Sequence, residues 1–326
     1  MQTVTAADYY ASMPWIDRPD ADIDAYVRRL PPEERDWAKH YLEAWRRDGI
    51  IILENAVDEL TTDALLADID HLVRHPAEYN LPVEVEGKQH ADISEVSPAA
   101  MLQPGSKFNS IHAISAAARA VSLNAPAMRF LRHVFCDDPA MVQSLTFFRG
   151  SQQWVHVDYP YVRNQTKIAQ MAASWVALED INIEAGALAY WPGAHDVDKL
   201  GLFDWGNGSI LYEPDSSRTP AELCDYLRQR LDQMPMPKKT FTPKRGDCLI
   251  WHCLMPHEGT PVTNQALTRK SYVTHYTCKS AYPTHFMKPN ALENKHFDQR
   301  NGGYYFHYTW LDNPRQLPSS EKGFSA

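Results

Sequence analysis

The stretch MVQSLTFFRGSQQWVHVD at residues 141–158 marks a change in the pattern of the chain. Before it, apolar residues recur at helical spacing. From it onward, short runs rich in Val, Ile, Phe and Trp alternate with turn residues, which is typical of strands. We expect strands at 141–148, 153–158, 168–178, 187–191, 247–252 and 269–278. Helices followed by a β-rich part predict a mainly β fold with helical support, whose core is a jelly roll able to enclose a ligand.

The first part of the chain predicts three helices and one strand. Pro31-Pro32-Glu33-Glu34 is typical of a first helical turn, and Gly49 ends that helix. Ile50–Leu53 follows as a short buried strand. A second apolar helical face runs from about Leu65 to Val73, and a third helix is expected from Asn124 to about residue 134. Residues 1–30 and 80–110 show no such periodicity and are expected to be irregular.

We expect a single domain over residues 1–326, because no linker or repeat divides the chain. Helical support would occupy about 30–135 and the jelly-roll core about 140–280. An insertion at 196–240 contains one expected helix near 220–231. An aromatic extension covers 280–326, and Tyr304–Tyr308 with Trp310 are candidates either to cover a pocket or to pack on the outer sheet.

Composition and charge exclude several classes of protein. The 326 residues include 41 acidic and 32 basic side chains, a net charge of −9, which argues against nucleic acid or an anionic membrane as partner. No apolar run approaches the ~20 residues of a membrane span, and the first residues do not resemble a signal peptide. The five cysteines form no CxxC pair, so reduced thiols and a cytoplasmic protein are expected. We expect a small-molecule partner, and the oligomeric state stays open.

A metal motif lies at the end of the opening stretch. On a strand, residues i and i+2 share a face, so His156 and Asp158 can offer one imidazole and one carboxylate to a single ion. A second histidine would complete the facial triad of two histidines and one carboxylate, which leaves three positions open on Fe(II). Such a site also needs a later cation to hold an organic acid cosubstrate.

Three His-x-Asp motifs compete for this role. For His156/Asp158, His257 follows a β-like run and Arg269 lies 12 residues later. For His90/Asp92, the histidine at a comparable distance is His195. No Arg or Lys lies at residues 205–209, where the cation would then be expected. For His296/Asp298, only 28 residues follow Asp298. Both of these pairs are therefore interpreted as surface or loop polar pairs.

Two further choices concern the later strands. His252 lies inside the apolar run 249–251, where a hydrogen-bonded core histidine is the ordinary case, whereas His257 follows Pro256 at the end of the strand. We therefore choose His257 as the third ligand and keep His252 as a candidate for the pocket lining. Arg269 and Ser271 are again i and i+2, so a guanidinium and a hydroxyl would share a face and could hold a carboxylate.

Four blocks in this order resemble the phytanoyl-CoA dioxygenase family of Fe(II)/2-oxoglutarate oxygenases, over about residues 45–280. The blocks are RDGIIILEN at 47–55, HVD at 156–158, EAGALAYWPGAH at 184–195, and the run from Gly246 to His257 with Asn264 and Arg269-Lys270. The usual His-Gly-Ser of the family is His257-Glu258-Gly259 here. The resemblance implies a double-stranded β-helix of cupin-like type.

The resemblance also implies a set of cofactors and roles. Fe(II) would bind His156, Asp158 and His257, and Arg269 would hold the distal carboxylate of 2-oxoglutarate. Gln143 and Trp175 match residues that lie near the cosubstrate in two branches of the family. O2 is the remaining cosubstrate.

The expected function is a dioxygenase that hydroxylates an unactivated C–H bond of a small polar or amphipathic metabolite and releases succinate and CO2. Desaturation, ring formation and epoxidation stay open, whereas halogenation does not fit because Asp158 is present. The alternative is a non-catalytic or differently metallated cupin-like binding protein or isomerase. Candidates for the substrate pocket are Tyr159, Tyr161, Arg163 and His252.

Overall fold

The computed structural model describes residues 3–162, 166–206, 208–311, 314–321 and 323–324. Its centre is a ten-stranded sheet. The main path of this sheet runs, in spatial order, through β1 (Ile50–Leu53), β9 (Cys248–His252), β6 (Ala172–Ala177), β11 (Ser271–Cys278), β5 (Pro139–Phe147), β4 (Lys107–Asn109), β2 (Val83–Val85) and β3 (Lys88–His90). All neighbours along this path are antiparallel.

A smaller antiparallel sheet lies against one face of the large one. It contains β10 (His257–Gly259), β7 (Leu188–Tyr190) and β8 (Lys239–Phe241). Apolar side chains of both sheets, such as Trp175 and Leu249 from the large sheet and Leu188 and Phe241 from the small one, form a shared core. The two sheets therefore enclose space between them, as a jelly roll requires.

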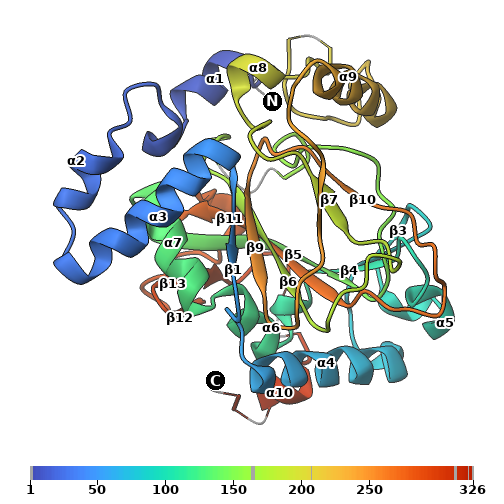
Figure 1. Ribbon diagram of the computed structural model, residues 1–326. Helices are drawn as coiled ribbons and strands as arrows, with labels where there is room; N and C mark the ends of the chain where they lie inside the picture. The colour runs from blue at the N-terminus through green and yellow to red at the C-terminus, as the bar shows by residue number, and fades with distance from the viewer. Residues whose placement is uncertain (1–2, 163–165, 207, 312–313, 322, 325–326) are drawn as a thin grey trace.

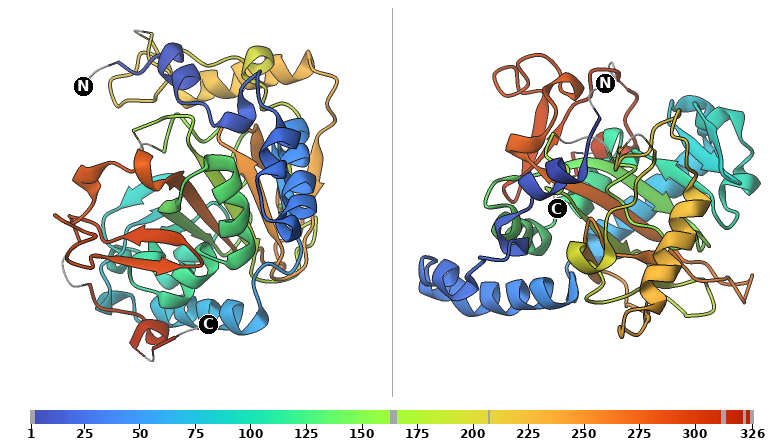
Figure 2. Two further views of the ribbon diagram at one scale, coloured as in Figure 1. Left: turned by 90° about the vertical axis from the view of Figure 1, so that its left-hand side faces the viewer. Right: turned by 90° about the horizontal axis from the view of Figure 1, so that it is seen from above.

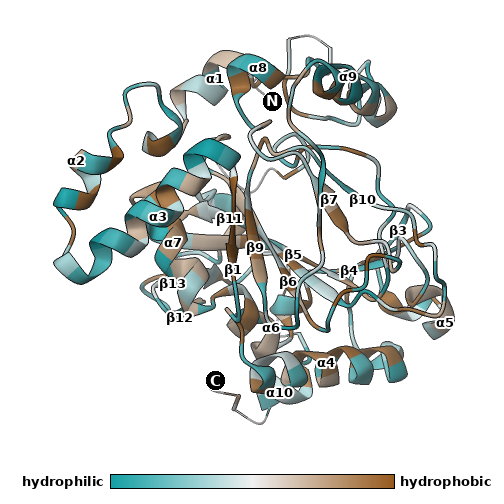
Figure 3. Ribbon diagram, in the orientation of Figure 1, coloured by the Kyte–Doolittle hydropathy of each residue, from teal (hydrophilic) through white to brown (hydrophobic). Residues whose placement is uncertain are grey.

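The helices of the described chain are α1 (Ala6–Ala11), α2 (Ile23–Arg28), α3 (Pro32–Asp48), α4 (Glu59–Arg74), α5 (Pro98–Met101), α6 (Ala116–Ser122), α7 (Ala125–Phe135), α8 (Val197–Leu200), α9 (Pro220–Asp232) and α10 (Pro318–Glu321). The helices α3, α4, α6 and α7 pack on the opposite face of the large sheet, whereas α1, α8 and α9 lie together at one end of the molecule (Figures 1 and 2). Figure 3 shows hydrophobic central strands and a hydrophilic outer side on α3. Burial of one face of each element thus holds the layers together.

The expected long elements are confirmed at α3, α4, α7 and α9 and at strands β1, β5, β6, β7, β9 and β11. Gly49 ends α3 with φ +68°, the left-handed geometry that favours glycine. The expected strand at 153–158 is wrong: only His156 forms an isolated bridge, to His257. The rest of the segment forms no regular secondary structure, and the chain bends at Val155 and Asp158.

Two expectations of irregular structure are also wrong. Residues 80–110 contain β2, β3, α5 and β4, and residues 1–30 contain α1 and α2. These elements have three to six residues each, too few for a periodic pattern to stand out.

The aromatic extension adds two strands to the large sheet. Its strands β12 (Phe297–Arg300) and β13 (Gly303–Phe306) form a hairpin, and β13 pairs in parallel with β5. The hydroxyl of Tyr308 donates to the carbonyl oxygen of Val142 at 2.8 Å. The extension therefore continues the large sheet beside the first residues of β5.

A buried carboxylate joins the helical layer to the end of the described chain. Asp68 on α4 accepts hydrogen bonds from the hydroxyls of Ser115 and Ser319 and, at 3.1 Å, from the backbone N–H of Ser319. Asp68 is only 1% exposed, so these donors replace the water that the carboxylate has lost. Within the described residues, no helix combines the length and apolar character needed to cross a bilayer.

Candidate functional site

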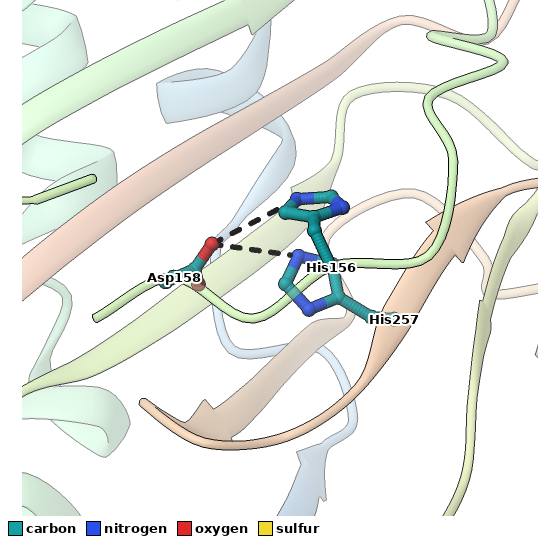
Figure 4. Close-up of side chains that lie close together, drawn as sticks. All are labelled: His156, Asp158 and His257. Atoms are coloured by element: carbon teal, nitrogen blue, oxygen red, sulfur yellow. Dashed lines mark ion pairs between the residues drawn. The ribbon is translucent and has the colours of Figure 1, made fainter. Parts of the chain in front are cut away.

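His156, Asp158 and His257 meet between the two sheets (Figure 4). Asp158 Oδ1 lies 3.9 Å from His156 Nε2 and 3.6 Å from His257 Nε2. One ligand atom from each residue lies within 4.8 Å of the others, and within the described parts of the chain no other group of His, Cys, Asp and Glu meets this criterion. Two imidazoles and one carboxylate form a donor set that fits Fe(II).

The backbone fixes the two histidines. His156 and His257 exchange backbone hydrogen bonds across their bridge, and the N–H of Asp158 donates to the carbonyl of Cys253. Each imidazole also uses Nδ1 locally: Nδ1 lies 2.8 Å from the carbonyl oxygen of Trp154 in His156 and 2.9 Å from that of Met255 in His257. A carbonyl only accepts, so Nδ1 carries the proton and the Nε2 lone pairs stay available to a metal.

Charge states at the triad suit metal binding. Burial first, and then the neighbouring His257, lower the pKa of His156 to about 3. Burial alone would raise the pKa of Asp158, but His257 and His275 hold it below its ordinary value. At neutral pH His156 is therefore neutral and Asp158 is charged, as metal coordination requires.

The triad opens into a cavity of about 870 Å³. The register of the large sheet places one face of its central strands toward this cavity. Gln143 on β5 lies opposite His275 on β11, and Val273 on β11 lies opposite Trp175 on β6. Arg269 precedes β11, and it lines the same cavity as these four residues.

Arg269 is a buried cation without an anion. It is 2% exposed, and among the described residues its guanidinium has no ion-pair or hydrogen-bond partner. The guanidinium carbon lies 5.4 Å from the ring centre of Phe147 and 5.6 Å from that of Trp175. Burial lowers the pKa of Arg269 to about 10. An unpaired buried charge is costly, so this arrangement indicates that an anion completes the site.

The other predicted site residues lie at varying distances from this cavity. Gln143, Trp175 and Tyr161 line it. Ser271 shares the inward face of β11, and its buried hydroxyl has no hydrogen-bond partner in the described chain, but it is not among the lining residues. Tyr159 is buried in an apolar cluster away from the lining. Arg163 lies outside the described residues.

His252 has a different environment from the one expected of a pocket residue. Its Nε2 lies 3.2 Å from Asp17 Oδ2, and its Nδ1 accepts from the backbone N–H of Leu254. It is not among the residues that line the cavity. His252 therefore ties the N-terminal segment to β9.

The two competing His-x-Asp pairs have structural partners. Asp92 accepts a hydrogen bond from the backbone of Ser94, and His90 lies 3.4 Å from Glu95. Asp298 forms an ion pair with Arg119 at 2.8 Å.

Sequence reasoning missed two kinds of site residue. Trp251 and His275 both contact Asp158. A polar wall of the cavity, defined here as Glu84, Gln89, Lys107 and Asn109, comes from the region expected to be irregular. Alternation along β11 is the one signal for His275, because it lies two and four residues from Val273 and Ser271 on the same face.

Comparisons with known proteins agree with this geometry. The model of the family described as phytanoyl-CoA dioxygenase (PhyH) matches residues 45–271. A curated relative from Caenorhabditis elegans, named phytanoyl-CoA dioxygenase domain-containing protein 1 homolog, is 20% identical over 269 residues, which cover 72% of this chain and 88% of the relative.

Solved structures are similar in fold. The non-haem alpha ketoglutarate dependent carbocyclase SnoK from nogalamycin biosynthesis superposes with a TM-score of 0.53 at 14% identity, over 78% of this chain and 88% of that chain. The epimerase SnoN in complex with Fe3+, alpha ketoglutarate and nogalamycin RO gives 0.51 at 18% identity, over 90% and 96%. These likenesses confirm the predicted mainly β fold with helical support.

Proposed function

The chain belongs to the phytanoyl-CoA dioxygenase (PhyH) family, and from this premise we propose that it is a non-haem Fe(II)- and 2-oxoglutarate-dependent dioxygenase. The proposed reaction is hydroxylation of an unactivated C–H bond in a small polar or amphipathic metabolite. Fe(II), 2-oxoglutarate and O2 would together supply the oxidant: 2-oxoglutarate loses CO2, one oxygen atom of O2 enters the succinate formed, and the other enters the new hydroxyl group of the product. His156, Asp158 and His257 would hold the metal.

The observation that carries the proposal is the unpaired guanidinium of Arg269 in the cavity of the triad. A dicarboxylate would provide a partner for the metal and for the guanidinium: one end would bind the metal and the far carboxylate would bind Arg269. Phe147 and Trp175 flank the guanidinium and would exclude water from this pair. We place Gln143 and Ser271 beside the same cosubstrate, because both share the inward face of the sheet.

The polar wall supports a polar substrate. Lys107 and Glu84 are register partners on β4 and β2, and their side chains pair at 3.1 Å. Gln89 lies opposite Glu84 on β3, and its side-chain oxygen accepts from Asn109. Of the described lining residues, only Lys107 and Arg269 are cationic. A coenzyme A thioester would find no cluster of cations for its phosphates, so a neutral or zwitterionic polar group fits better. Tyr161 would contact the substrate near the mouth.

Two alternatives differ from this proposal. The buried, unpaired guanidinium of Arg269 beside the triad argues against a non-catalytic or differently metallated cupin-like binding protein or isomerase. The second alternative, a different oxidative outcome from the same cofactors, differs less from the proposal. It is favoured by the structural neighbours, which include a carbocyclase and an epimerase. Product analysis separates hydroxylation from these outcomes.

The test is a cosubstrate assay. Protein reconstituted with Fe(II) without oxygen is given 2-oxoglutarate and O2 with a panel of polar and amphipathic metabolites, and succinate and CO2 are measured. We expect a release of succinate and CO2 that depends on Fe(II) and that increases when metabolites of one chemical class in the panel are added. If the Fe(II)-loaded protein does not bind 2-oxoglutarate in a calorimetric titration, the proposal is wrong.

A further inference from the structure

The two oxygens of Asp158 have different surroundings. Oδ1 faces Nε2 of both triad histidines. Oδ2 accepts a hydrogen bond of 2.7 Å from the indole Nε1–H of Trp251. His275 Nε2 lies 3.5 Å from the same Oδ2. One oxygen of the carboxylate thus faces the two triad histidines, and the other contacts side chains of the large sheet.

Trp251 is rigidly placed for this contact. It lies on β9, between β1 and β6, where it is paired with Ile50 and Ala173. Its side chain is 3% exposed, and its ring centre lies 5.0 Å from that of His257. One side chain therefore contacts two of the three candidate ligands, one through a hydrogen bond and the other through ring packing.

The division of the carboxylate matters because a carboxylate can bind a metal through one oxygen or through both. A six-coordinate metal with two histidines and one carboxylate oxygen keeps three positions open. A chelating 2-oxo acid needs two of them and O2 needs the third. A second carboxylate oxygen would take one of these positions. A charge-assisted hydrogen bond at Oδ2 opposes that second bond.

We propose that Trp251, with His275 as a weaker second contact, is a positioning residue that keeps Asp158 bound to the metal through Oδ1 alone. This inference rests on the proposed function. It assigns to β9 and β11 a role beyond shaping the cavity: they set the number of coordination positions left for the cosubstrates. Removing the indole N–H while keeping an aromatic ring should release Oδ2 without opening a large gap.

The experiment compares Trp251→Phe with Trp45→Phe. Trp45 is a matched control, because it is also buried and its indole N–H also donates to a carboxylate, Asp17 Oδ1 at 3.2 Å, but it contacts none of the triad. Fe(II) affinity is measured without oxygen, and the visible charge-transfer absorption of the Fe(II)–2-oxoglutarate chelate is recorded. For Trp251→Phe we expect a weaker chelate absorption, because the freed Oδ2 can occupy a position that 2-oxoglutarate needs. We also expect an Fe(II) affinity about 10- to 100-fold weaker, because the carboxylate is no longer held in its orientation toward the triad. Trp45→Phe should bind Fe(II) like the wild type.

The outcomes separate this inference from the proposed function. If Trp251→Phe is folded and keeps both the affinity and the absorption of the wild type, the positioning role is wrong while the proposed function stands. If the wild type itself binds no Fe(II), the proposed function fails and takes the inference with it. If Trp251→Phe does not fold, His275→Leu tests the same oxygen from β11, with a smaller loss of affinity expected and an unchanged affinity contradicting the role of that contact.

Discussion

His156 and His257 exchange two backbone hydrogen bonds of 3.0 Å, one in each direction. The same pair repeats one local geometry, since each Nδ1 lies next to the carbonyl oxygen two residues before it. The relative position of the two imidazoles is therefore set by the backbone. A metal ion entering this site would meet ligands that are already oriented, so little ordering is required on binding.

His257→Ala should lose metal more severely than His252→Ala. The imidazole of His257 faces Asp158 Oδ1, whereas that of His252 faces Asp17. We expect the purified His257 variant to contain little iron after reconstitution and the His252 variant to retain about one equivalent with a lower melting temperature. Iron content and melting temperature of the two variants decide this. An empty His252 variant beside a loaded His257 variant would contradict the ligand choice.

Asp158→Ala should abolish turnover, because it removes the one anionic ligand of the candidate site. Asp92→Ala and Asp298→Ala are the controls, since these carboxylates contact Ser94 and Arg119 instead. Both controls should retain most of the activity. Succinate release under limiting Fe(II) measures all three, and wild-type turnover in Asp158→Ala would remove it from the metal site.

Arg269→Ala should raise the 2-oxoglutarate requirement by one to several orders of magnitude. Each hydrogen bond to a charged group contributes about 1.5–3 kcal/mol, and 1.4 kcal/mol corresponds to about tenfold in affinity. Arg269→Lys should recover only part of the loss, because an ammonium lacks the planar fork. Iron binding should persist in both variants.

The control for Arg269 is its neighbour Lys270, which is partly exposed and lies 3.4 Å from Glu179. Lys270→Ala should leave the 2-oxoglutarate titration unchanged. If calorimetry gives the same affinity for wild type and Arg269→Ala, the organic acid binds elsewhere.

Lys107→Met should weaken substrate binding rather than the oxidation step. It leaves Glu84 without its cation in the polar wall, so a polar substrate group loses one partner and meets an uncompensated charge. We expect KM for the substrate found in the screen to rise about tenfold or more, consistent with ~1.5 kcal/mol for a charged hydrogen bond, while kcat changes little. Lys199→Met, at an exposed lysine paired with Asp196, is the control. Unchanged KM in the Lys107 variant would remove the wall from the substrate site.

Stability should fall with pH below about 6.5 because of His112. Burial, and then the charge of Arg119, lower the pKa of His112 to about 3. Its two nitrogens lie 2.6 Å from the hydroxyl of Ser144 and 2.8 Å from that of Tyr308. Between pH 6.5 and 3 the unfolded chain binds a proton that the native state excludes. The contribution of His112 to the free energy of unfolding is therefore fully present above pH 6.5. It is lost on acidification, at about 1.4 kcal/mol per pH unit.

The check is the free energy of unfolding in urea at pH 7 and at pH 5, for wild type and for His112→Gln. Glutamine can donate and accept but does not titrate, so the variant should be less stable at pH 7 and should depend less on pH. Equal slopes in the two proteins would exclude His112 as the source.

The long elements and the triad were predictable because their signals are local. A helical face spans many residues, and His156 and Asp158 are only two residues apart, so they stay close together although the expected strand at 153–158 did not form. Trp251 was not predictable as a contact of Asp158. This contact depends on the packing of β9 against a loop that is distant in sequence, and no spacing of residues in the sequence predicts that packing. The polar wall was missed because three-residue strands gain their stability from neighbours, not from pattern.

The hydrogen bonds between Asp68 and Ser319 also have a consequence for the order of folding. Asp68 precedes most strands of both sheets along the chain, whereas its partner Ser319 follows all of the described strands. Contacts of long sequence separation form late in folding, so we expect the hydrogen bonds from Ser319 to complete the surroundings of Asp68 only after the bond from Ser115 has formed. We therefore expect the face of α4 that carries Asp68 to stay hydrated, and accessible to chaperones, until α10 has docked.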